Sequence, residues 1–299
     1  GCPCHIMDGV ISMKRKKVTV NSMAKYIFII PALAFFSFAI AIPLFMGINI
    51  AFTDWNGIAK DYNYVGLQNF ITMISDKRLL RPVRNTAIFA VLGTVLGNVA
   101  SLGLALLVNQ KLGKLSGIAK VIFFVPVCLS AILTAFLWGF IYRSVLPSLF
   151  SVKSLLGSKD YVILAITLMG VWNTCGTNML IYLAGLKSIP TDLYEASRAD
   201  GANGLQRFWN ITIPMLMPSF SICLTISLTG WLREFAMTLS STGGGPAGYS
   251  RTISIYIFEN LYQYNKAGYG EAVSLVFVIV LVIIGNLVSS FFRRREVEV

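Results

Sequence analysis

Six long stretches of this 299-residue chain contain no Asp, Glu, Lys or Arg. A helix needs about 20 apolar residues to cross the hydrocarbon core of a bilayer, and each stretch reaches that length. Backbone groups in lipid must be hydrogen-bonded internally, and a helix does this within one segment. We therefore predict an all-α integral membrane protein with six transmembrane helices, at residues 26–53, 85–110, 121–142, 161–186, 208–232 and 272–292.

The composition agrees with a membrane protein. The chain is 56% hydrophobic and only 13% charged, whereas a soluble domain carries about 25% charged residues. The net charge of +12 would suggest nucleic acid on a soluble chain, but here the basic residues flank apolar stretches, where they orient a chain in a membrane. We predict one membrane domain, 26–292, between two tails, 1–25 and 293–299.

The distribution of basic residues predicts the orientation. Six spans place both termini on one side, together with the loops 111–120 and 187–207. That side holds 14 Lys and Arg in 63 residues, against 11 in the 88 residues of the opposite side. Because basic residues concentrate in cytoplasmic segments, we expect both termini to be cytoplasmic in a multi-pass protein of the plasma or inner membrane.

Several kinds of chemistry have no residues to support them. Cys2, Cys4 and His5 form a cluster without a fourth ligand, so we expect no metal site. No G-x-x-x-x-G-K-[ST] loop is present for binding ATP, and no charged side chain lies inside a predicted span, as proton-coupled transporters usually require. We expect no catalytic residues and no enzyme, but a pathway powered by another protein. Met13 and the basic run after it are typical of a native start, which leaves the origin of residues 1–12 open.

One cytoplasmic loop, 187–207, has the pattern of a helix, a turn and a second helix. Pro190 followed by Thr191-Asp192 predicts a helix start with a side-chain cap. Gly201 can adopt the positive φ that ends a helix, and a second helix can begin near Asn203. An ordinary surface helix would satisfy the same pattern.

The residues of this loop resemble the EAA loop of binding-protein-dependent ABC importer permeases. The resemblance rests on Glu195-Ala196-Ser197, Asp200-Gly201-Ala202 and the later Ile213-Pro214. Ser197 stands where the family pattern has a second Ala, and it is also small. Weaker matches to sugar permeases of the maltose and multiple-sugar type extend over about residues 25–292, at Val65–Phe70, Asn85-Thr86, Phe124-x-Pro126, Trp172 and Thr242–Pro246.

The resemblance implies a type I ABC importer permease with a MetI-like core. The helix near 191–200 would then be a coupling helix that docks on an ATPase subunit, with Glu195 making a polar contact and Gly201 forming the turn. The implied partners are a second permease in a heterodimer, two ATPases that bind ATP and Mg²⁺, and an extracytoplasmic sugar-binding protein. This chain would need no cofactor of its own. The coupling residues expected from the resemblance are Glu195, Ala196, Ser197, Asp200, Gly201 and Ala202.

A sugar path needs aromatic faces and neutral hydrogen-bonding groups. By resemblance, the candidates are Trp172, Asn173, Thr174, Thr177, Trp231 and Glu234. Each has a competing explanation: Trp anchors span ends at the membrane interface, Asn and Thr join helices, and Glu234 could pair with Arg233. Two alternatives to a sugar importer stay open, namely an EAA-loop permease for another substrate class such as phosphate, peptide or amino acid, and a self-contained secondary transporter.

Overall fold

Residues 22–110 and 114–293 are described by the computed structural model of the chain, which divides into two units, 1–47 and 48–299. The first unit holds α1 (Ser22–Phe36), a π-helical turn (Ser37–Ala41) and most of α2 (Ile42–Ala51), whose last residues belong to the second unit. The residues Ile29–Ala51 are long and apolar enough to cross a membrane. The Cys2, Cys4 and His5 cluster lies outside the described residues.

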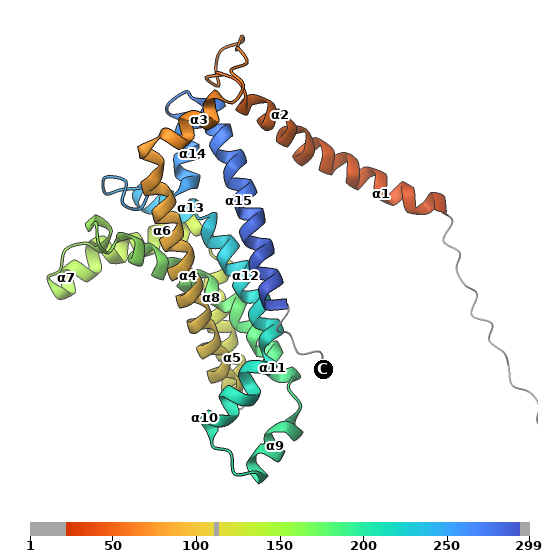
Figure 1. Ribbon diagram of the computed structural model, residues 1–299. Coiled ribbons are helices and arrows are strands. Elements are labelled where there is room, and N and C mark those ends of the chain that lie inside the picture. Colours follow the sequence, from red (N-terminus) through yellow and green to blue (C-terminus); the bar gives the residue numbers. More distant parts are fainter. Residues whose placement is uncertain (1–21, 111–113, 294–299) are drawn as a thin grey trace, which may run out of the picture. The chain divides into compact units, whose positions relative to one another are not determined.

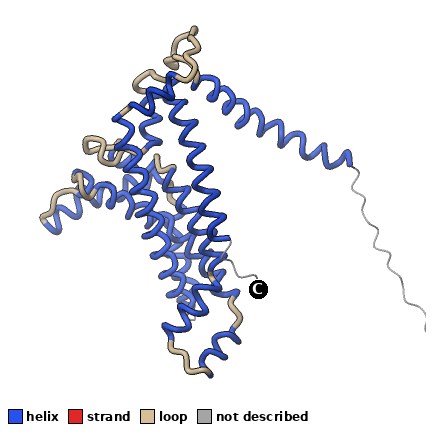
Figure 2. Tube along the Cα trace, viewed as in Figure 1, coloured by secondary structure: helices blue, strands red, loops and turns tan. Residues whose placement is uncertain are grey.

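The second unit is built from helices, and no strand occurs among the residues that the structure describes (Figure 2). In Figure 1, α9 and α10 lie at the opposite end of this unit from α3 and α14. The α-helices of the unit are α3 (Gln68–Ser75), α4 (Lys77–Asn109), α5 (Lys114–Phe124), α6 (Ala131–Phe140), α7 (Leu146–Phe150), α8 (Val162–Ser188), α9 (Thr191–Ala199), α10 (Gly204–Arg207), α11 (Ile213–Met215), α12 (Met217–Leu232), α13 (Ala236–Thr242), α14 (Ile253–Tyr262) and α15 (Ala267–Arg293).

Within the described residues, five helices are long and apolar enough to span a membrane, and a bent pair makes a sixth candidate. The bent pair, Gly204–Met215 and Met217–Leu232, turns by 68°. Pro218 lies just after the bend and has no N–H to donate to the carbonyl of Pro214, so the helical hydrogen-bond ladder is broken there. The predicted all-α membrane fold is confirmed, and the span predicted over 208–232 corresponds to this bent pair.

The continuous helix predicted over 121–142 is wrong. α5 ends at Phe124, a 3-10 turn follows, and α6 begins only at Ala131, with the Ser130 hydroxyl accepting a hydrogen bond from the Leu133 N–H at 3.2 Å. Pro126 in the turn cannot continue an α-helical ladder. The long apolar helix of this region is instead Ala131–Phe150.

The start of the second span also differs from the prediction. α4 begins at Lys77 rather than at 85, because Asp76 caps it by accepting a hydrogen bond from the Arg78 N–H at 2.9 Å. The first turns of α4 therefore carry the basic residues that the sequence analysis assigned to a loop. α15 begins at Ala267 rather than at 272, so it also extends beyond the apolar stretch.

The packing of α4, α8 and α12 depends on two glycines. The indole of Trp231 lies against Gly93 and Gly170, where an added Cβ would approach it to 2.2 and 2.3 Å. The same indole lies parallel to the ring of Phe89, one turn before Gly93 on α4, with 6.4 Å between ring centroids. Only glycine at both positions leaves room for this buried ring, so the glycines set how closely the helices approach.

Candidate coupling surface and substrate path

The helix α9 forms where the sequence predicts it, but not with the predicted cap. Pro190 occupies the N-cap position in an extended conformation and provides no side-chain hydrogen bond. The Thr191 hydroxyl instead points to the Asp192 carboxylate, 3.5 Å away. The side-chain cap expected from Thr191-Asp192 is therefore wrong. Pro190 instead separates α9 from α8, because the residue before a proline is disfavoured in the α region and Ile189 is extended.

The turn after α9 confirms the expectation for Gly201, which has a φ of +78°. The N–H of Ala202 donates to the Ser197 carbonyl at 2.9 Å, and the N–H of Gly201 donates to the Arg198 carbonyl at 3.1 Å. This pair of bonds is the Schellman arrangement, which requires the left-handed conformation at Gly201. The turn consequently has one defined geometry.

The second helix begins as the sequence predicts. Asn203 and Gln206 form a reciprocal capping box, with hydrogen bonds of 2.9 and 2.8 Å to each other's backbone N–H groups. Tyr194 of α9 also hydrogen-bonds Thr212 through their hydroxyls at 3.0 Å. α9, the turn and the helix that enters the membrane are therefore joined by side-chain and backbone hydrogen bonds.

The six predicted coupling residues lie together on this helix and its turn. Glu195, Ala196, Asp200 and Gly201 are exposed. Ser197 is half-buried, and its hydroxyl donates to the Tyr194 carbonyl at 2.9 Å; the hydroxyl that replaces the second Ala of the family pattern is thus satisfied within the helix. Within the described part of the chain, no ion pair or side-chain hydrogen bond engages the carboxylates of Glu195 and Asp200. Both charges are available to another protein.

Two of the predicted substrate-path residues are used inside the protein. Trp231 is 7% exposed and belongs to the packed core. The amide nitrogen of Asn173 donates to three oxygens, those of the Pro126 carbonyl at 2.8 Å, the Leu129 carbonyl at 3.1 Å and the Thr134 hydroxyl at 3.1 Å. Asn173 thereby satisfies backbone groups at the break between α5 and α6.

Three further candidates on α8 are exposed. Trp172 packs edge-on against Trp138, with 5.7 Å between ring centroids. The Thr174 hydroxyl donates to the Gly170 carbonyl at 2.8 Å, and Thr177 is exposed. Residues two apart on a helix face different sides, so Trp172 and Thr174 do not line one wall. The structure does not gather the six candidates into a single pocket.

The ion pair considered between Arg233 and Glu234 is wrong. A carboxylate oxygen of Glu234 accepts hydrogen bonds from the backbone N–H groups of Met237 and Thr238, both at 3.0 Å. Arg233 donates instead to the Thr229 carbonyl at 3.1 Å. Burial raises the pKa of Glu234, against the opposing effect of these hydrogen bonds. Glu234 therefore caps the first turn of α13.

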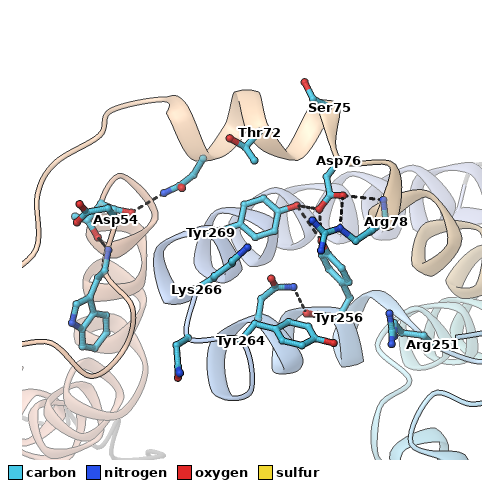
Figure 3. A pocket seen from close by; sticks show the side chains of 15 residues that line it. Asp54, Thr72, Ser75, Asp76, Arg78, Arg251, Tyr256, Tyr264, Lys266 and Tyr269 are labelled. Atoms are coloured by element: carbon cyan, nitrogen blue, oxygen red, sulfur yellow. Dashed lines mark hydrogen bonds and ion pairs between the residues drawn. The ribbon is translucent and has the colours of Figure 1, made fainter. Parts of the chain in front are cut away.

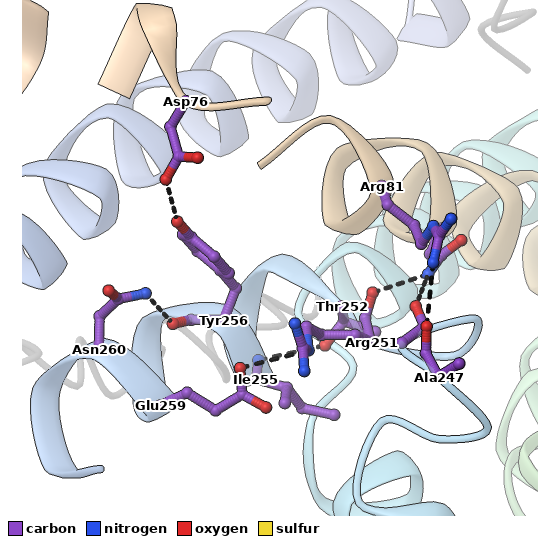
Figure 4. A network of polar contacts seen from close by, with 11 residues as sticks. Asp76, Arg81, Ala247, Arg251, Thr252, Ile255, Tyr256, Glu259 and Asn260 are labelled. Atoms are coloured by element: carbon purple, nitrogen blue, oxygen red, sulfur yellow. Dashed lines mark hydrogen bonds and ion pairs between the residues drawn. The ribbon is translucent and has the colours of Figure 1, made fainter. Parts of the chain in front are cut away.

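A polar network at the α3 and α14 end of the second unit was not found by sequence reasoning (Figure 4). Asp76 accepts hydrogen bonds from the hydroxyls of Tyr256 at 2.6 Å and Tyr269 at 3.0 Å. Burial opposes ionisation of Asp76, but these bonds and the Arg78 N–H outweigh it and hold its pKa below the ordinary value. The sequence separations exceed 170 residues, so no local pattern could reveal these contacts.

The same network holds the loop before α14. Arg251 pairs with the buried Glu259 at 3.2 Å, and burial raises the pKa of Glu259 although Arg251 opposes the rise. Asn85 of α4 donates to the carbonyls of Gly248 and Arg251, both at 3.0 Å. The sequence signal that could have indicated this pair is the lone Glu259 in the otherwise uncharged stretch 252–264.

The fold and these sites define a multi-helix membrane protein with a rigid, charged helix exposed at one end. A family model described as binding-protein-dependent transport system inner membrane component matches residues 93–295. The probable starch degradation products transport system permease protein of Thermoanaerobacterium thermosulfurigenes is 31% identical over 291 residues, which cover 95% of this chain and 99% of the relative. The trehalose/maltose transport system permease protein of Thermococcus litoralis is 32% identical over 271 residues, or 86% and 89% of the two chains.

The solved structures agree. A chain of a bacterial ABC transporter that imports the acidic polysaccharide alginate has a TM-score of 0.79 and 22% identity, with 91% of this chain and 96% of that chain covered. That likeness shows the fold. The chain belongs to the family of binding-protein-dependent transport system inner membrane components. It is a multi-pass membrane subunit of a transport system, and not an enzyme.

Proposed function

We propose that this chain is the permease subunit of an ATP-driven importer that translocates a sugar or oligosaccharide. The family assignment provides the transport role, and the names of the relatives favour carbohydrate: starch degradation products in one and trehalose or maltose in another. The substrate would be delivered by an extracytoplasmic binding protein, because the family is binding-protein-dependent. A structure of the alginate importer in complex with a pentasaccharide-bound periplasmic protein supports such an arrangement.

The observation that carries the mechanism is the rigid, exposed α9 with its unpaired charges. A helix that is held at its C-terminal end by the Gly201 turn and near its middle by the Tyr194–Thr212 hydrogen bond can transmit a push or pull, whereas a flexible loop would absorb it. Two partner ATPases that bind ATP and Mg²⁺ would close on nucleotide and move this helix. Glu195 would contact the ATPase surface, with Ala196 and Ser197 allowing close approach.

The orientation follows from the same proposal. α9 must be cytoplasmic to meet an ATPase, and the higher density of basic residues in the segments 1–25, 111–120, 187–207 and 293–299 supports cytoplasmic termini. The α3 and α14 end would then face the binding protein. For the path itself, Trp172, Thr174 and Thr177 remain the better candidates, because Trp231 is buried and the amide nitrogen of Asn173 is occupied.

The test is uptake into proteoliposomes that contain the complete transporter and its binding protein. Glu195→Ala should cut ATP-dependent sugar uptake, because it removes the exposed carboxylate that meets the ATPase. Sugar binding by the external protein should be unchanged. The matched control is Asp192→Ala, which removes an exposed carboxylate from the first turn of the same helix.

Two outcomes would contradict the proposal. Sugar uptake by this chain without any ATPase would show a self-contained secondary transporter. Uptake of phosphate, a peptide or an amino acid in place of every sugar tested would assign the chain to another EAA-loop importer class.

A further inference from the structure

A pocket of about 760 Å³ lies between the 53–55 loop, α3, α14 and the start of α15 (Figure 3). Its volume falls within the roughly 300–1,000 Å³ of small-molecule sites. The pocket lies at the opposite end of the unit from α9, and most of its lining comes from segments outside the apolar spans. It is therefore separate from the coupling surface and from the path candidates on α8.

The pocket has a rigid inner wall. Tyr256 and Tyr269 are 4% and 9% exposed, and both hydroxyls are held by the Asp76 carboxylate. The Asn260 side chain donates to the Tyr256 carbonyl at 2.8 Å, which leaves its amide oxygen as an acceptor. Because these side chains are already fixed, a ligand that binds here loses little affinity to the conformational entropy of ordering them.

Two aromatic residues, Trp55 and Tyr264, line the pocket without being fully buried. Trp55 is half-buried and is oriented by a hydrogen bond from its indole N–H to the Ala59 carbonyl at 2.8 Å. Tyr264 is 51% exposed. Thr72, Ser75 and Asn265 add neutral hydroxyl and amide groups to the lining. This mixture suits a ligand that has both apolar C–H faces and many hydroxyl groups.

The charges of the lining balance once Glu259, which lies behind the lining and pairs with Arg251, is included. Five charged residues border the pocket, namely Asp54, Asp76, Arg78, Arg251 and Lys266. Arg251 is neutralised by Glu259 at 3.2 Å, and Arg78 pairs with Asp76 at 3.5 Å. Asp54 and Lys266 remain, with opposite signs. A strongly anionic or cationic ligand would find no net countercharge here.

We propose that this outer pocket is a subsite for a neutral oligosaccharide, occupied before the sugar enters the membrane path. A pyranose ring has C–H faces that stack on Trp55 and Tyr264 and hydroxyls that reach the neutral polar groups of the wall. The inference rests on the proposed sugar-import function and adds the charge class of the substrate and its place of first contact with this chain.

The test uses the assembled transporter in lipid nanodiscs, without the binding protein, and saturation-transfer NMR on three neutral probes: maltotriose, arabinotriose and diacetylchitobiose. We expect saturable transfer to the ring protons of at least one probe. Trp55→Ala and Tyr264→Ala should each raise its Kd about three- to tenfold, the loss of one aromatic contact. Trp55→Phe should keep most of the binding, since it retains a ring.

The chain offers a matched control in Tyr262→Ala. Tyr262 is the last residue of α14, two residues before Tyr264; it is 71% exposed and does not line the pocket. Its replacement should leave the Kd unchanged. Trigalacturonate, an acidic trisaccharide, should not bind at concentrations that saturate the neutral probe.

Several results would overturn the inference: no saturable neutral probe, binding unaffected by both pocket variants, or binding of trigalacturonate alone. If the variants weaken attachment of the binding protein but not of any saccharide, the pocket receives a protein loop instead. ATP-dependent uptake by the wild-type transporter separates the two proposals. Uptake of a sugar without pocket binding would leave the importer function standing and remove only the subsite.

Discussion

Gly201→Ala tests whether the shape of the turn after α9 transmits force. An added Cβ at Gly201 would meet no atom within 4 Å, so the substitution creates no clash. Its cost comes only from the backbone, because φ is +78° and an L-residue in the left-handed region loses about 1–2 kcal/mol. A local cost of that size shifts the equilibrium between the formed and the opened turn by about 5- to 30-fold.

The assay is ATP-dependent sugar uptake by proteoliposomes containing the complete transporter, with ATP hydrolysis measured in parallel. We expect uptake to fall about fivefold or more, with less transport for each ATP hydrolysed, because an opened turn no longer holds α9 against the helix that enters the membrane. Gly201→Asn should restore part of the uptake, since Asn tolerates the left-handed conformation better than Ala.

Gly204→Ala is the matched control for this experiment. Gly204 lies three residues further on, at the start of α10, with no positive φ and its nearest neighbour 4.0 Å from an added Cβ. Alanine there favours the helix, so uptake should match the wild type. Equal uptake by Gly201→Ala and the wild type, with intact assembly, would refute the argument that the turn must be rigid.

Two predictions concern stability. Gly93→Ala should lower the free energy of unfolding of the purified chain by about 1–3 kcal/mol, because its Cβ would lie 2.2 Å from the Trp231 indole. Gly97→Ala, whose nearest contact would be at 3.9 Å, is the control. An equal effect of both substitutions would contradict the packing argument. Asp76 has a lowered pKa, so its stabilising effect is present above the unfolded-state pKa of about 3.9 and is lost as the pH falls through the lower folded-state pKa. Asp76→Asn should therefore destabilise the wild-type fold at pH 7 and have a smaller effect near pH 3, measured by thermal unfolding in detergent; a pH-independent difference would contradict this assignment.

The elements that the sequence predicted correctly are those set by local chemistry. Gly201 has the expected positive φ, and Asn203 begins the expected second helix through bonds to residues three apart in the chain. The length of an apolar span is set by the thickness of the hydrocarbon core of the bilayer, and not by contacts with other parts of the chain. Each of these features is determined within a few residues, so it can be read without knowing the partner segments.

The ends and breaks of the spans were harder to predict, because a stretch without charges is not the same as a helix. α4 continues past the apolar stretch to Lys77, where Asp76 provides the cap. In the opposite direction, Pro126 interrupts an apolar run that has no charge to mark a boundary. Membrane helices tolerate proline where a neighbour satisfies the freed carbonyls, so the outcome at Pro126 depended on a residue of another helix.

That neighbour is Asn173, and it shows why path residues cannot be chosen from residue type. An Asn in a span can bind a hydroxyl of a sugar or join two helices, and the sequence supports both interpretations. Its three acceptors lie 39 to 47 residues earlier in the chain, where no local pattern connects them. A polar group that satisfies a broken backbone cannot turn to a passing substrate without leaving carbonyls unpaired in the membrane. Exposed positions such as Trp172 and Thr177 are therefore better candidates for the path. Asn173→Leu should lower the stability of the segment between α5 and α6 and leave sugar selectivity unchanged.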